Sequence, residues 1–340
     1  MTERKSAPPK KHWLIIAAVL VVACMIGAIV YYLDGLRGRE TDPSFNPGEE
    51  IDADVLEYDG RLYRLKDRLE TVLIMGLDTF ENTAEAEGGS INHQQADFLL
   101  LLLMDKENRT CVPLHINRDT ICTIWLLDIY GEPMNNKTAQ IALAHAYGSG
   151  GKDSCRNQVR AVSELLFDRR IDHYIALPMD AVAQLNDLVG GVTVKVTDDF
   201  SAVDPTLVQG QEITLQGQQA LTYVRQRYDV GDASNLSRMA RQRQYMQALR
   251  LKLMERMEGD SDFVMRVLNT LSDAMQSDCS VYKLSDIAEA LTEYEIEDFQ
   301  TIAGEAVQGE EFIEFYADED ALLQQVIDLF FVPEESGGKQ

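Results

Sequence analysis

The sequence predicts an α/β domain that follows a single transmembrane helix. Three observations support this prediction. Residues 13–33 carry no charged side chain, short apolar runs alternate with segments of helical periodicity from residue 71 onwards, and 45% of the 340 residues are hydrophobic. That composition suits a large buried core. Strands that alternate with helices along a chain are typical of the α/β class.

The first 33 residues indicate a membrane anchor. Four basic side chains lie within residues 1–12, and the 21 uncharged residues 13–33 follow them. As a helix, this stretch is long enough to cross a hydrocarbon core of roughly 30 Å. A cleaved signal peptide is the alternative, but its apolar region usually spans about 7–15 residues. We therefore expect one membrane span, with residues 1–12 in the cytoplasm and the rest of the chain outside the cell membrane.

A polar linker and a hairpin come next. Residues 34–54 are acidic and contain prolines and glycines, a composition typical of a solvated stalk. Two strand-like runs, 55–58 and 61–65, flank an Asp-Gly pair, which favours a two-residue hairpin turn. We assign residues 34–64 to the stalk and hairpin. One folded domain, 65–333, and a short tail, 334–340, complete the predicted organisation.

The domain begins with three predicted buried strands. Residues 71–78, 96–105 and 110–117 are apolar almost throughout, which is typical of strands that are covered on both faces. Helical and strand-like segments then alternate. We expect further strands at 173–177, 192–196, 299–304 and 311–316. We expect helices at 138–148, 157–167, 180–189, 217–224, 237–257, 262–275, 285–294 and 320–331.

The net charge of −25 limits the classes of partner. It argues against a general nucleic-acid binder, because such a surface needs an excess of Lys and Arg. The five histidines are scattered and no CxxC or HExxH motif occurs, so the sequence predicts no zinc site. Four cysteines follow the span, in a compartment that permits disulfides, and the sequence does not choose among their three pairings. They are Cys111, Cys122, Cys155 and Cys279.

Two carboxylates mark the ends of neighbouring strands. Asp78 ends one apolar strand, and Asp97 opens the next. Such a pair could share a hard cation such as Mg²⁺, which takes oxygen ligands and keeps several waters. A role for each aspartate as a turn or cap residue is the alternative.

Arginines collect where predicted strands and helices end. Arg118 follows the strand at 110–117, at a place where ligand-binding groups gather in α/β sheets. Arg225 and Arg227 follow the helix at 217–224, and residues two apart in an extended segment project to the same side. Arginine binds phosphate oxygens with two parallel donors.

The helix at 237–257 adds three polar residues on one face. Arg238, Arg241 and Gln242 are spaced i, i+3 and i+4. A solvated helix face and a phosphate site both explain this run. Two carboxylates beside several arginines would suit metal-assisted phosphoryl chemistry, in which the charge of a diphosphate must be neutralised.

Taken in order, several blocks of the sequence resemble the LytR-CpsA-Psr proteins, membrane-anchored enzymes of bacterial cell-wall assembly. The blocks are VLIMGLD (72–78), ADFLLLLLMD (96–105), INRDT (116–120), LAHAYGSG (143–150), IDHYIALPMDAVAQLNDLVGGVTVKV (171–196), LQGQQALTYVRQR (215–227) and GDASNLSRMARQRQY (231–245). They cover nearly the whole external domain. The resemblance implies a central mixed β-sheet flanked by helices on both faces.

The resemblance also implies a function. The family transfers a glycopolymer from a polyprenyl-diphosphate carrier to peptidoglycan. Carried over by position, Asp78 and Asp97 would bind Mg²⁺, and the lipid would lie in an apolar tunnel between the sheet and the long helices. Arg118 would act in catalysis, and Asp97 and Asp232 are candidates for the base, between which the sequence does not choose. The residues that would hold phosphate oxygens are Arg118, Arg225, Arg227, Arg238, Arg241 and Gln242.

The sequence departs from the family pattern at two places. Residues 115–117 read His-Ile-Asn where Ser-Ile-Pro is usual, and residues 140–142 read Gln-Ile-Ala where Lys-Ile-Asn is frequent. The second departure removes a cationic phosphate contact, for which Lys137 is a candidate substitute.

A non-catalytic protein is the alternative function. It would bind polyprenyl phosphate and act as a scaffold or envelope regulator. Such a binder need not keep two acidic residues together with the Arg225 and Arg227 pair, so the sequence favours the enzyme.

Overall fold

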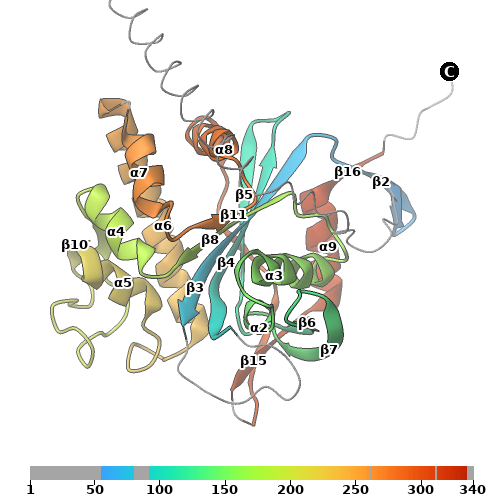
Figure 1. Cartoon of the computed structure of the whole chain (residues 1–340), viewed down its shortest axis with the longest axis horizontal. Helices are drawn as coiled ribbons and strands as arrows, with labels where there is room; N and C mark the ends of the chain where they lie inside the picture. The colour runs from blue at the N-terminus through green and yellow to red at the C-terminus, as the bar shows by residue number, and fades with distance from the viewer. Residues whose placement is uncertain (1–54, 80–91, 261, 311, 335–340) are drawn as a thin grey trace, which may run out of the picture. The chain divides into compact units, whose positions relative to one another are not determined.

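The computed structural model describes residues 55–79, 92–260, 262–310 and 312–334 (Figure 1). They belong to one compact unit that extends from residue 53. The predicted span, 13–33, and most of the predicted stalk lie outside the described residues. In the part of the chain that the structure describes, no helix is both long enough and apolar enough to cross a bilayer.

A seven-stranded mixed sheet lies at the centre of this unit. Its strand order is β11-β8-β3-β4-β5-β12, and β13 also pairs with β5. β3 is antiparallel to β4 but parallel to β8, which confirms the expected mixed sheet. The three predicted buried strands are confirmed as β3, β4 and β5. The strands are β3 Leu69–Thr79, β4 Gln94–Asp105, β5 Thr110–Ile116, β8 His173–Pro178, β11 Gln276–Ser277, β12 Glu295–Ile296 and β13 Gln300–Thr301.

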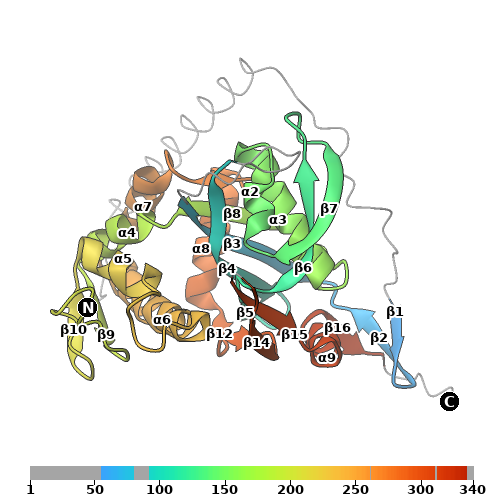
Figure 2. The ribbon, with the colours of Figure 1, turned by 90° about the horizontal axis from the view of Figure 1, so that it is seen from below.

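Helices cover both faces of the sheet (Figure 2). Successive residues of a strand point to opposite faces. Leu73 and Leu99 pack into one apolar core with α3 and α9, whereas Val72 and Leu100 pack into a second core with α4, α5 and α6. Because both faces are buried, the strands are apolar without alternation. The helices are α3 Gly151–Leu165, α4 Ala181–Leu188, α5 Gly217–Arg225, α6 Asn235–Gly259, α7 Phe263–Leu271, α8 Val281–Glu293 and α9 Glu319–Phe330.

The segment 138–148 differs from the predicted helix. Its first residues belong to strand β7, Pro133–Gln140, which pairs antiparallel with β6, Ile121–Leu127. The helix that follows, α2, has only four residues, Leu143–Ala146. The apolar spacing over 138–148 was compatible with a helix, but pairing with β6 satisfies the backbone of residues 133–140. Periodicity alone does not separate such short segments.

The Asp-Gly hairpin is confirmed. β1, Val55–Tyr58, pairs with β2, Arg61–Leu65, and both Asp59 and Gly60 have positive φ, as a tight hairpin turn requires. β2 also pairs with β16, Phe331–Pro333, so the hairpin is joined to the end of the domain. The remaining strands are β9 Val192–Lys195, β10 Glu212–Leu215, β14 Gly304–Gln308 and β15 Ile313–Ala317.

Candidate functional site

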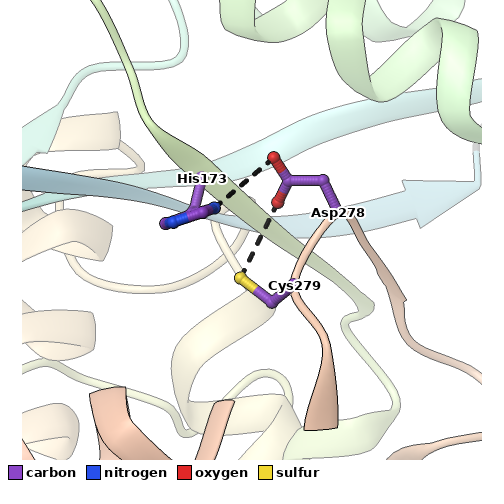
Figure 3. Close-up of side chains that lie close together, drawn as sticks. All are labelled: His173, Asp278 and Cys279. Atoms are coloured by element: carbon purple, nitrogen blue, oxygen red, sulfur yellow. Dashed lines mark hydrogen bonds and ion pairs between the residues drawn. The ribbon is translucent and has the colours of Figure 1, made fainter. Parts of the chain in front are cut away.

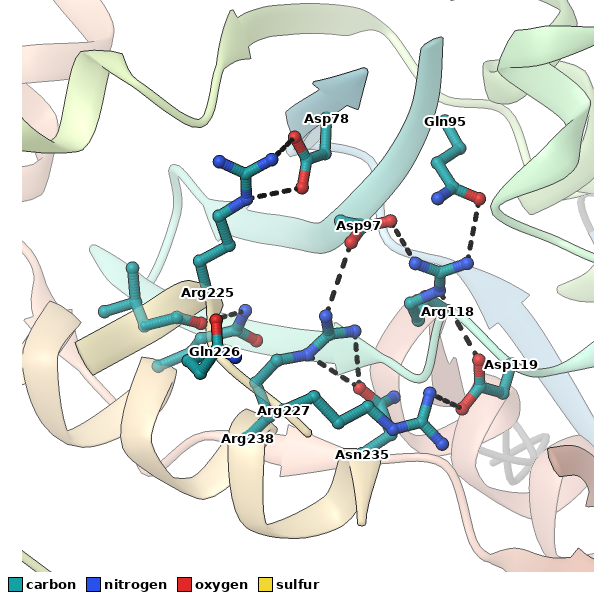
Figure 4. A network of polar contacts seen from close by, with 12 residues as sticks. Asp78, Gln95, Asp97, Arg118, Asp119, Arg225, Gln226, Arg227, Asn235 and Arg238 are labelled. Carbon is teal, nitrogen blue, oxygen red and sulfur yellow. Dashed lines mark hydrogen bonds and ion pairs between the residues drawn. The ribbon is translucent and has the colours of Figure 1, made fainter. Parts of the chain in front are cut away.

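A β-bulge positions Asp97. The register of β3 and β4 passes from Gly76 opposite Phe98 to Leu77 opposite Ala96, so Asp97 is the extra residue on β4. A bulge kinks its strand and redirects a side chain. Asp78 lies close by on β3 (Figure 4). The two carboxylates therefore belong to the same end of two adjacent strands.

Two arginines from different elements hold Asp97. Arg118 follows β5 and forms an ion pair with one carboxylate oxygen, and Arg238 Nη1, from α6, lies 3.3 Å from the other. Arg118 Nη2 also donates to Gln95 Oε1 at 2.9 Å. Burial lowers the pKa of Arg238 to about 10, although Asp97 opposes that shift. The network thus joins β4, the end of β5 and α6 around one carboxylate (Figure 4).

Arg225 binds the other carboxylate. It is the last residue of α5, and its Nε and Nη2 donate to the two oxygens of Asp78. The Arg225 side chain is 42% exposed, whereas that of Asp78 is 17% exposed. A ligand can therefore reach this arginine from solvent.

A third carboxylate supports the cluster from within the fold. Asp119 is 1% exposed; its Oδ1 lies 3.4 Å from Arg118 Nε, and its Oδ2 lies 3.4 Å from Arg227 Nη1. Gln140 Nε2 donates to Asp119 Oδ1 at 3.2 Å. Burial raises the pKa of Asp119, while Arg118 and Arg227 oppose this rise. Asp119 was not among the site residues predicted from the sequence, although its position directly after Arg118 was an available signal.

Two buried asparagines orient Arg238. Asn235 Oδ1 accepts hydrogen bonds from Arg238 Nε at 3.0 Å and from Nη2 at 2.6 Å. Asn235 Nδ2 in turn donates to Asn117 Oδ1 at 2.5 Å. Asn117 stands where the family pattern Ser-Ile-Pro has its proline, and it supplies an acceptor that a proline side chain lacks. Sequence reasoning missed both asparagines, because no local spacing links residue 117 to residue 235.

Arg227 and Asp232 lie in the loop before α6. Arg227 Nε donates to Ala233 O at 3.2 Å, which adds to its ion pair with Asp119. Asp232 is exposed and accepts a hydrogen bond from Ser234 N at 2.9 Å, and this bond lowers the pKa of Asp232. Among the described residues, Asp232 has no hydrogen bond or ion pair with the arginines of the cluster.

Arg241 has its partners outside the cluster around Asp97. It is 1% exposed, forms an ion pair with Asp198, and donates to the backbone oxygens of Tyr223 and Gln226. Its guanidinium therefore joins α6 to the end of α5. The spacing predicted that Arg238 and Arg241 share a helical face. In the structure Arg238 lies beside Asp97, whereas Arg241, nearly one turn further along α6, lies beside Asp198.

Gln242 and Lys137 have partners outside the arginine cluster. Gln242 Nε2 donates to Val224 O at 3.1 Å, and its side chain lines an apolar cavity. Lys137 Nζ lies 2.5 Å from the hydroxyl of Tyr147, so the structure directs this candidate substitute toward an aromatic ring. Gln140, which stands in place of the family's lysine, instead holds Asp119.

The apolar cavity adjoins the arginine cluster. It has a volume of about 140 Å³ and lies between β3, β4, α4 and α6. Phe98, Val224 and Gln242 line it, and these are neighbours of Asp97, Arg225 and Arg238 on their elements. Charged and apolar surfaces therefore meet at one place.

A glycine keeps part of the cavity open. A Cβ atom on Gly76 would lie 2.7 Å from Met179 Sδ and 2.9 Å from Phe98 Cβ. Both distances are shorter than a van der Waals contact allows. The arrangement suits an amphiphile that has phosphate groups at one end and a hydrocarbon chain at the other.

Comparisons with known proteins agree with this geometry. The model of the LytR_cpsA_psr family matches residues 44–327. The chain is 29% identical over 298 residues to the polyisoprenyl-teichoic acid–peptidoglycan teichoic acid transferase TagU of Oceanobacillus iheyensis, with 86% of this chain and 84% of that protein covered. It is 28% identical over 221 residues to the biofilm regulatory protein A of Streptococcus mutans, with 62% of this chain covered. That match spans 50% of the relative's length.

A solved structure has the same fold. The crystal structure of B. subtilis TagT superposes with a TM-score of 0.54 at 20% identity, and the match covers 81% of this chain and 92% of that one. At this level of identity, the similarity concerns the fold alone.

Proposed function

The chain belongs to the LytR-CpsA-Psr family, and from this premise we propose that it is a phosphotransferase that moves a glycopolymer from a polyprenyl-diphosphate carrier to peptidoglycan. The activity for which its relative TagU is named, polyisoprenyl-teichoic acid–peptidoglycan teichoic acid transferase, supports this assignment. The observation that carries the proposal is that Phe98, Val224 and Gln242, which neighbour Asp97, Arg225 and Arg238 on their elements, line the apolar cavity. A polyprenyl diphosphate needs both surfaces side by side.

The charges of the cluster suit a diphosphate that arrives with a cation. Asp78 is paired with Arg225, and Asp97 is paired with Arg118 and Arg238. When the diphosphate and its cation bind, the ion pairs exchange partners. The arginines then pair with phosphate oxygens, and the two carboxylates coordinate the cation. Every charge keeps an opposite partner throughout, so the desolvated site never holds an unpaired charge.

The donor set fits Mg²⁺. Asp78 and Asp97 offer only carboxylate oxygens, from adjacent strands, and two carboxylates plus waters and phosphate oxygens are a usual ligand set for this ion. Bound there, Mg²⁺ would neutralise negative charge on the diphosphate. We therefore propose Mg²⁺ as the cofactor.

The proposed reaction is a displacement at phosphorus. A hydroxyl oxygen of a peptidoglycan sugar forms a bond to the phosphorus that carries the glycan, and the bond from that phosphorus to the oxygen of polyprenyl phosphate breaks. The hydroxyl proton passes to a carboxylate, for which Asp97 and Asp232 remain the candidates. Arg118, Arg225, Arg227 and Arg238 stabilise the charge that develops on the phosphate oxygens.

We also propose that residues 13–33 anchor the protein as one span, with the N-terminus in the cytoplasm and the catalytic domain outside. The 21 uncharged residues behind a basic segment support this topology. Protease added to intact protoplasts should remove the domain and leave a short anchored fragment. Full protection of the domain would contradict the topology.

A purified-component assay tests the transfer itself. Full-length protein in detergent is mixed with a polyprenyl-diphosphate-linked saccharide, peptidoglycan fragments and Mg²⁺, and release of polyprenyl phosphate is measured. We expect turnover that depends on both substrates.

The second candidate function is a non-catalytic binder. The name of one relative, the biofilm regulatory protein A, favours this alternative. Tight binding of the lipid without any release of polyprenyl phosphate would favour this alternative over the transferase.

A further inference from the structure

A second cluster of reactive side chains lies at the other end of the central sheet. His173 is the first residue of β8 and pairs with Val72, whereas Asp78 lies near the opposite end of the same strand β3. Asp278 and Cys279 directly follow β11, which is antiparallel to β8. Ser277 pairs with Ile175, so the continued register places Cys279 opposite His173. Two neighbouring segments thus bring an imidazole, a carboxylate and a thiol together.

The three side chains point toward one another (Figure 3). One possible ligand atom from each residue lies within 4.8 Å of the other two. His173 Nδ1 is 3.7 Å from Asp278 Oδ2, and Cys279 Sγ is 3.7 Å from Asp278 Oδ1. A tetrahedral Zn²⁺ ion with ordinary bond lengths separates its ligand atoms by roughly 3.3–3.8 Å. Small side-chain movements would therefore complete this geometry.

A neighbouring carboxylate, that of Glu70, orients the His173 ring. His173 Nε2 lies 3.4 Å from Glu70 Oε1, which favours a proton on Nε2. His173 Nδ1 is buried and has no hydrogen-bond partner among the described residues. Its lone pair then faces Asp278 and Cys279. Metal-binding histidines are commonly oriented by a carboxylate on their second nitrogen in this way.

The local charges suit a divalent cation. Asp278 brings one negative charge, and the Cys279 thiolate would bring a second. Two lysines lie close by, Lys106 with its Nζ 2.9 Å from Glu70 Oε2 and Lys283 in an ion pair with the same carboxylate, so Glu70 compensates one of their two positive charges. With the Asp278 carboxylate and the Cys279 thiolate counted, the surroundings keep a net negative charge. Burial raises the pKa of Cys279 to about 11, so a bound metal has to displace the thiol proton.

We propose that His173, Asp278 and Cys279 form a binding site for Zn²⁺ or a similar borderline-soft divalent ion, with water as a fourth ligand. A nitrogen, oxygen and sulfur donor set selects such a metal over Mg²⁺. The ion ties β8 to the segment that leads into α8, and it stabilises the folded chain because the unfolded chain lacks the preformed site. This site is separate from the proposed Mg²⁺ site, and its test does not depend on transferase activity.

Cobalt spectroscopy tests the site. Full-length protein without an affinity tag is stripped with EDTA and titrated with Co²⁺ in excess Mg²⁺. We expect about one equivalent to bind with a thiolate-to-cobalt absorption band, which Zn²⁺ then abolishes. Cys279→Ser should remove the band, and His173→Gln should weaken Co²⁺ and Zn²⁺ affinity at least tenfold. Cys122→Ser is the matched control, because Cys122 is also a partly buried free thiol but lies on β6.

Thermal melting provides a second measurement. Zn²⁺ should raise the melting temperature of the wild type and of Cys122→Ser, but not that of Cys279→Ser. Asp278→Asn is the substitute variant if Cys279→Ser fails to fold. Tyr174 N donates to Asp278 Oδ1 at 2.9 Å, and the asparagine keeps an acceptor for this hydrogen bond. Equal cobalt spectra for the wild type and Cys279→Ser, or no Co²⁺ binding by the wild type, would overturn the proposal.

Discussion

Asp78 and Arg225 form a two-pronged ion pair that joins the end of β3 to the end of α5. Arg225 Nε lies 2.7 Å from Asp78 Oδ2, and Arg225 Nη2 lies 2.5 Å from Asp78 Oδ1. The pair closes one side of the cluster that also contains Asp97, Arg118 and Arg238 (Figure 4). Since the arginine is far more exposed than its partner, it is the member of the pair that a phosphate meets first.

Replacing Arg225 should abolish transfer and leave the fold intact. Arg225→Ala removes a partly exposed side chain but takes two hydrogen-bond donors from the largely buried Asp78 carboxylate, so the free energy of unfolding should fall by roughly 1–3 kcal/mol while the chain still folds. Release of polyprenyl phosphate should fall well beyond tenfold, which corresponds to about 1.4 kcal/mol in transition-state energy. Arg109→Ala is the matched control, because Arg109 is also exposed and ion-paired, with Glu293. Activity within threefold of wild type would contradict the phosphate-binding role.

Replacing Arg241 should have the opposite effect. Arg241→Ala removes a buried partner of Asp198 and of two backbone carbonyls. Losing one member of a buried pair costs roughly 3 kcal/mol or more. Urea unfolding should show this loss, whereas Arg266→Ala, which breaks an exposed pair with Asp260, should change stability by about 1 kcal/mol at most. Normal stability of Arg241→Ala would show that the arginine does not hold the end of α5.

Binding of Mg²⁺ and of diphosphate should be coupled. Two carboxylates alone hold Mg²⁺ weakly, and the arginines oppose a bare cation, whereas a polyprenyl diphosphate brings oxygen ligands and negative charge. Calorimetry should show that the affinity of the protein for Mg²⁺ rises strongly when the polyprenyl diphosphate is present. Asp97→Ala should lower the affinity for that diphosphate at saturating Mg²⁺. Coupling between two ligands is reciprocal. Equal Mg²⁺ affinity with and without the diphosphate would rule out shared coordination.

The cavity predicts a change in lipid selectivity. Gly76→Ala places a methyl group 2.7 Å from Met179 Sδ and 2.9 Å from Phe98 Cβ, so the Met179 thioether must move and β3 and β4 must separate slightly at the wall of the cavity. We expect weaker binding of long polyprenyl phosphates and unchanged binding of a short, water-soluble diphosphate. Fluorescence competition with lipids of different length measures both. An equal loss of affinity for the two probes would indicate general disruption of the site.

Buried His115 should make the fold sensitive to acid. Burial, together with Arg243 and Arg238, lowers the pKa of His115 to about 3, so it stays neutral in the fold but takes up a proton near pH 6.5 in the unfolded chain. Between these pH values the unfolded state binds more protons, and stability falls as pH falls. From pH 7 to pH 5 this one residue should cost about 2 kcal/mol.

The substitution His115→Gln tests that assignment. It should reduce the difference in unfolding free energy between pH 7 and pH 5, measured in urea, by about the same 2 kcal/mol. A variant that loses stability in acid as steeply as the wild type would assign the effect to other groups, such as His145, whose pKa burial also lowers.

Much of the fold could be predicted from the sequence. Several of the signals are local patterns in the sequence: the continuous apolar runs of β3, β4 and β5, the Asp-Gly hairpin and the periodicity of α6. Such patterns depend only on the residues within each element. The helix predicted at 138–148 was wrong in its first half, because the pairing of β7 with β6 is decided by a partner elsewhere in the chain.

The candidate site divides in the same way. Residue type, position at strand ends and on helices, and the resemblance to the family together selected Asp78, Asp97, Arg118, Arg225 and Arg238, among which the structure shows the ion pairs of Asp78 with Arg225 and of Asp97 with Arg118 and Arg238.

Only the tertiary structure decided which of two buried arginines lies beside Asp97. Arg238 and Arg241 look equivalent in sequence, yet one meets Asp97 and the other meets Asp198. Asn117, Asn235 and the cluster around His173 also depend on segments far apart in the chain. Local propensity acts over a few residues, whereas an ion pair, a hydrogen bond or a metal site depends on distances of a few ångströms between side chains, and packing of the whole domain sets those distances.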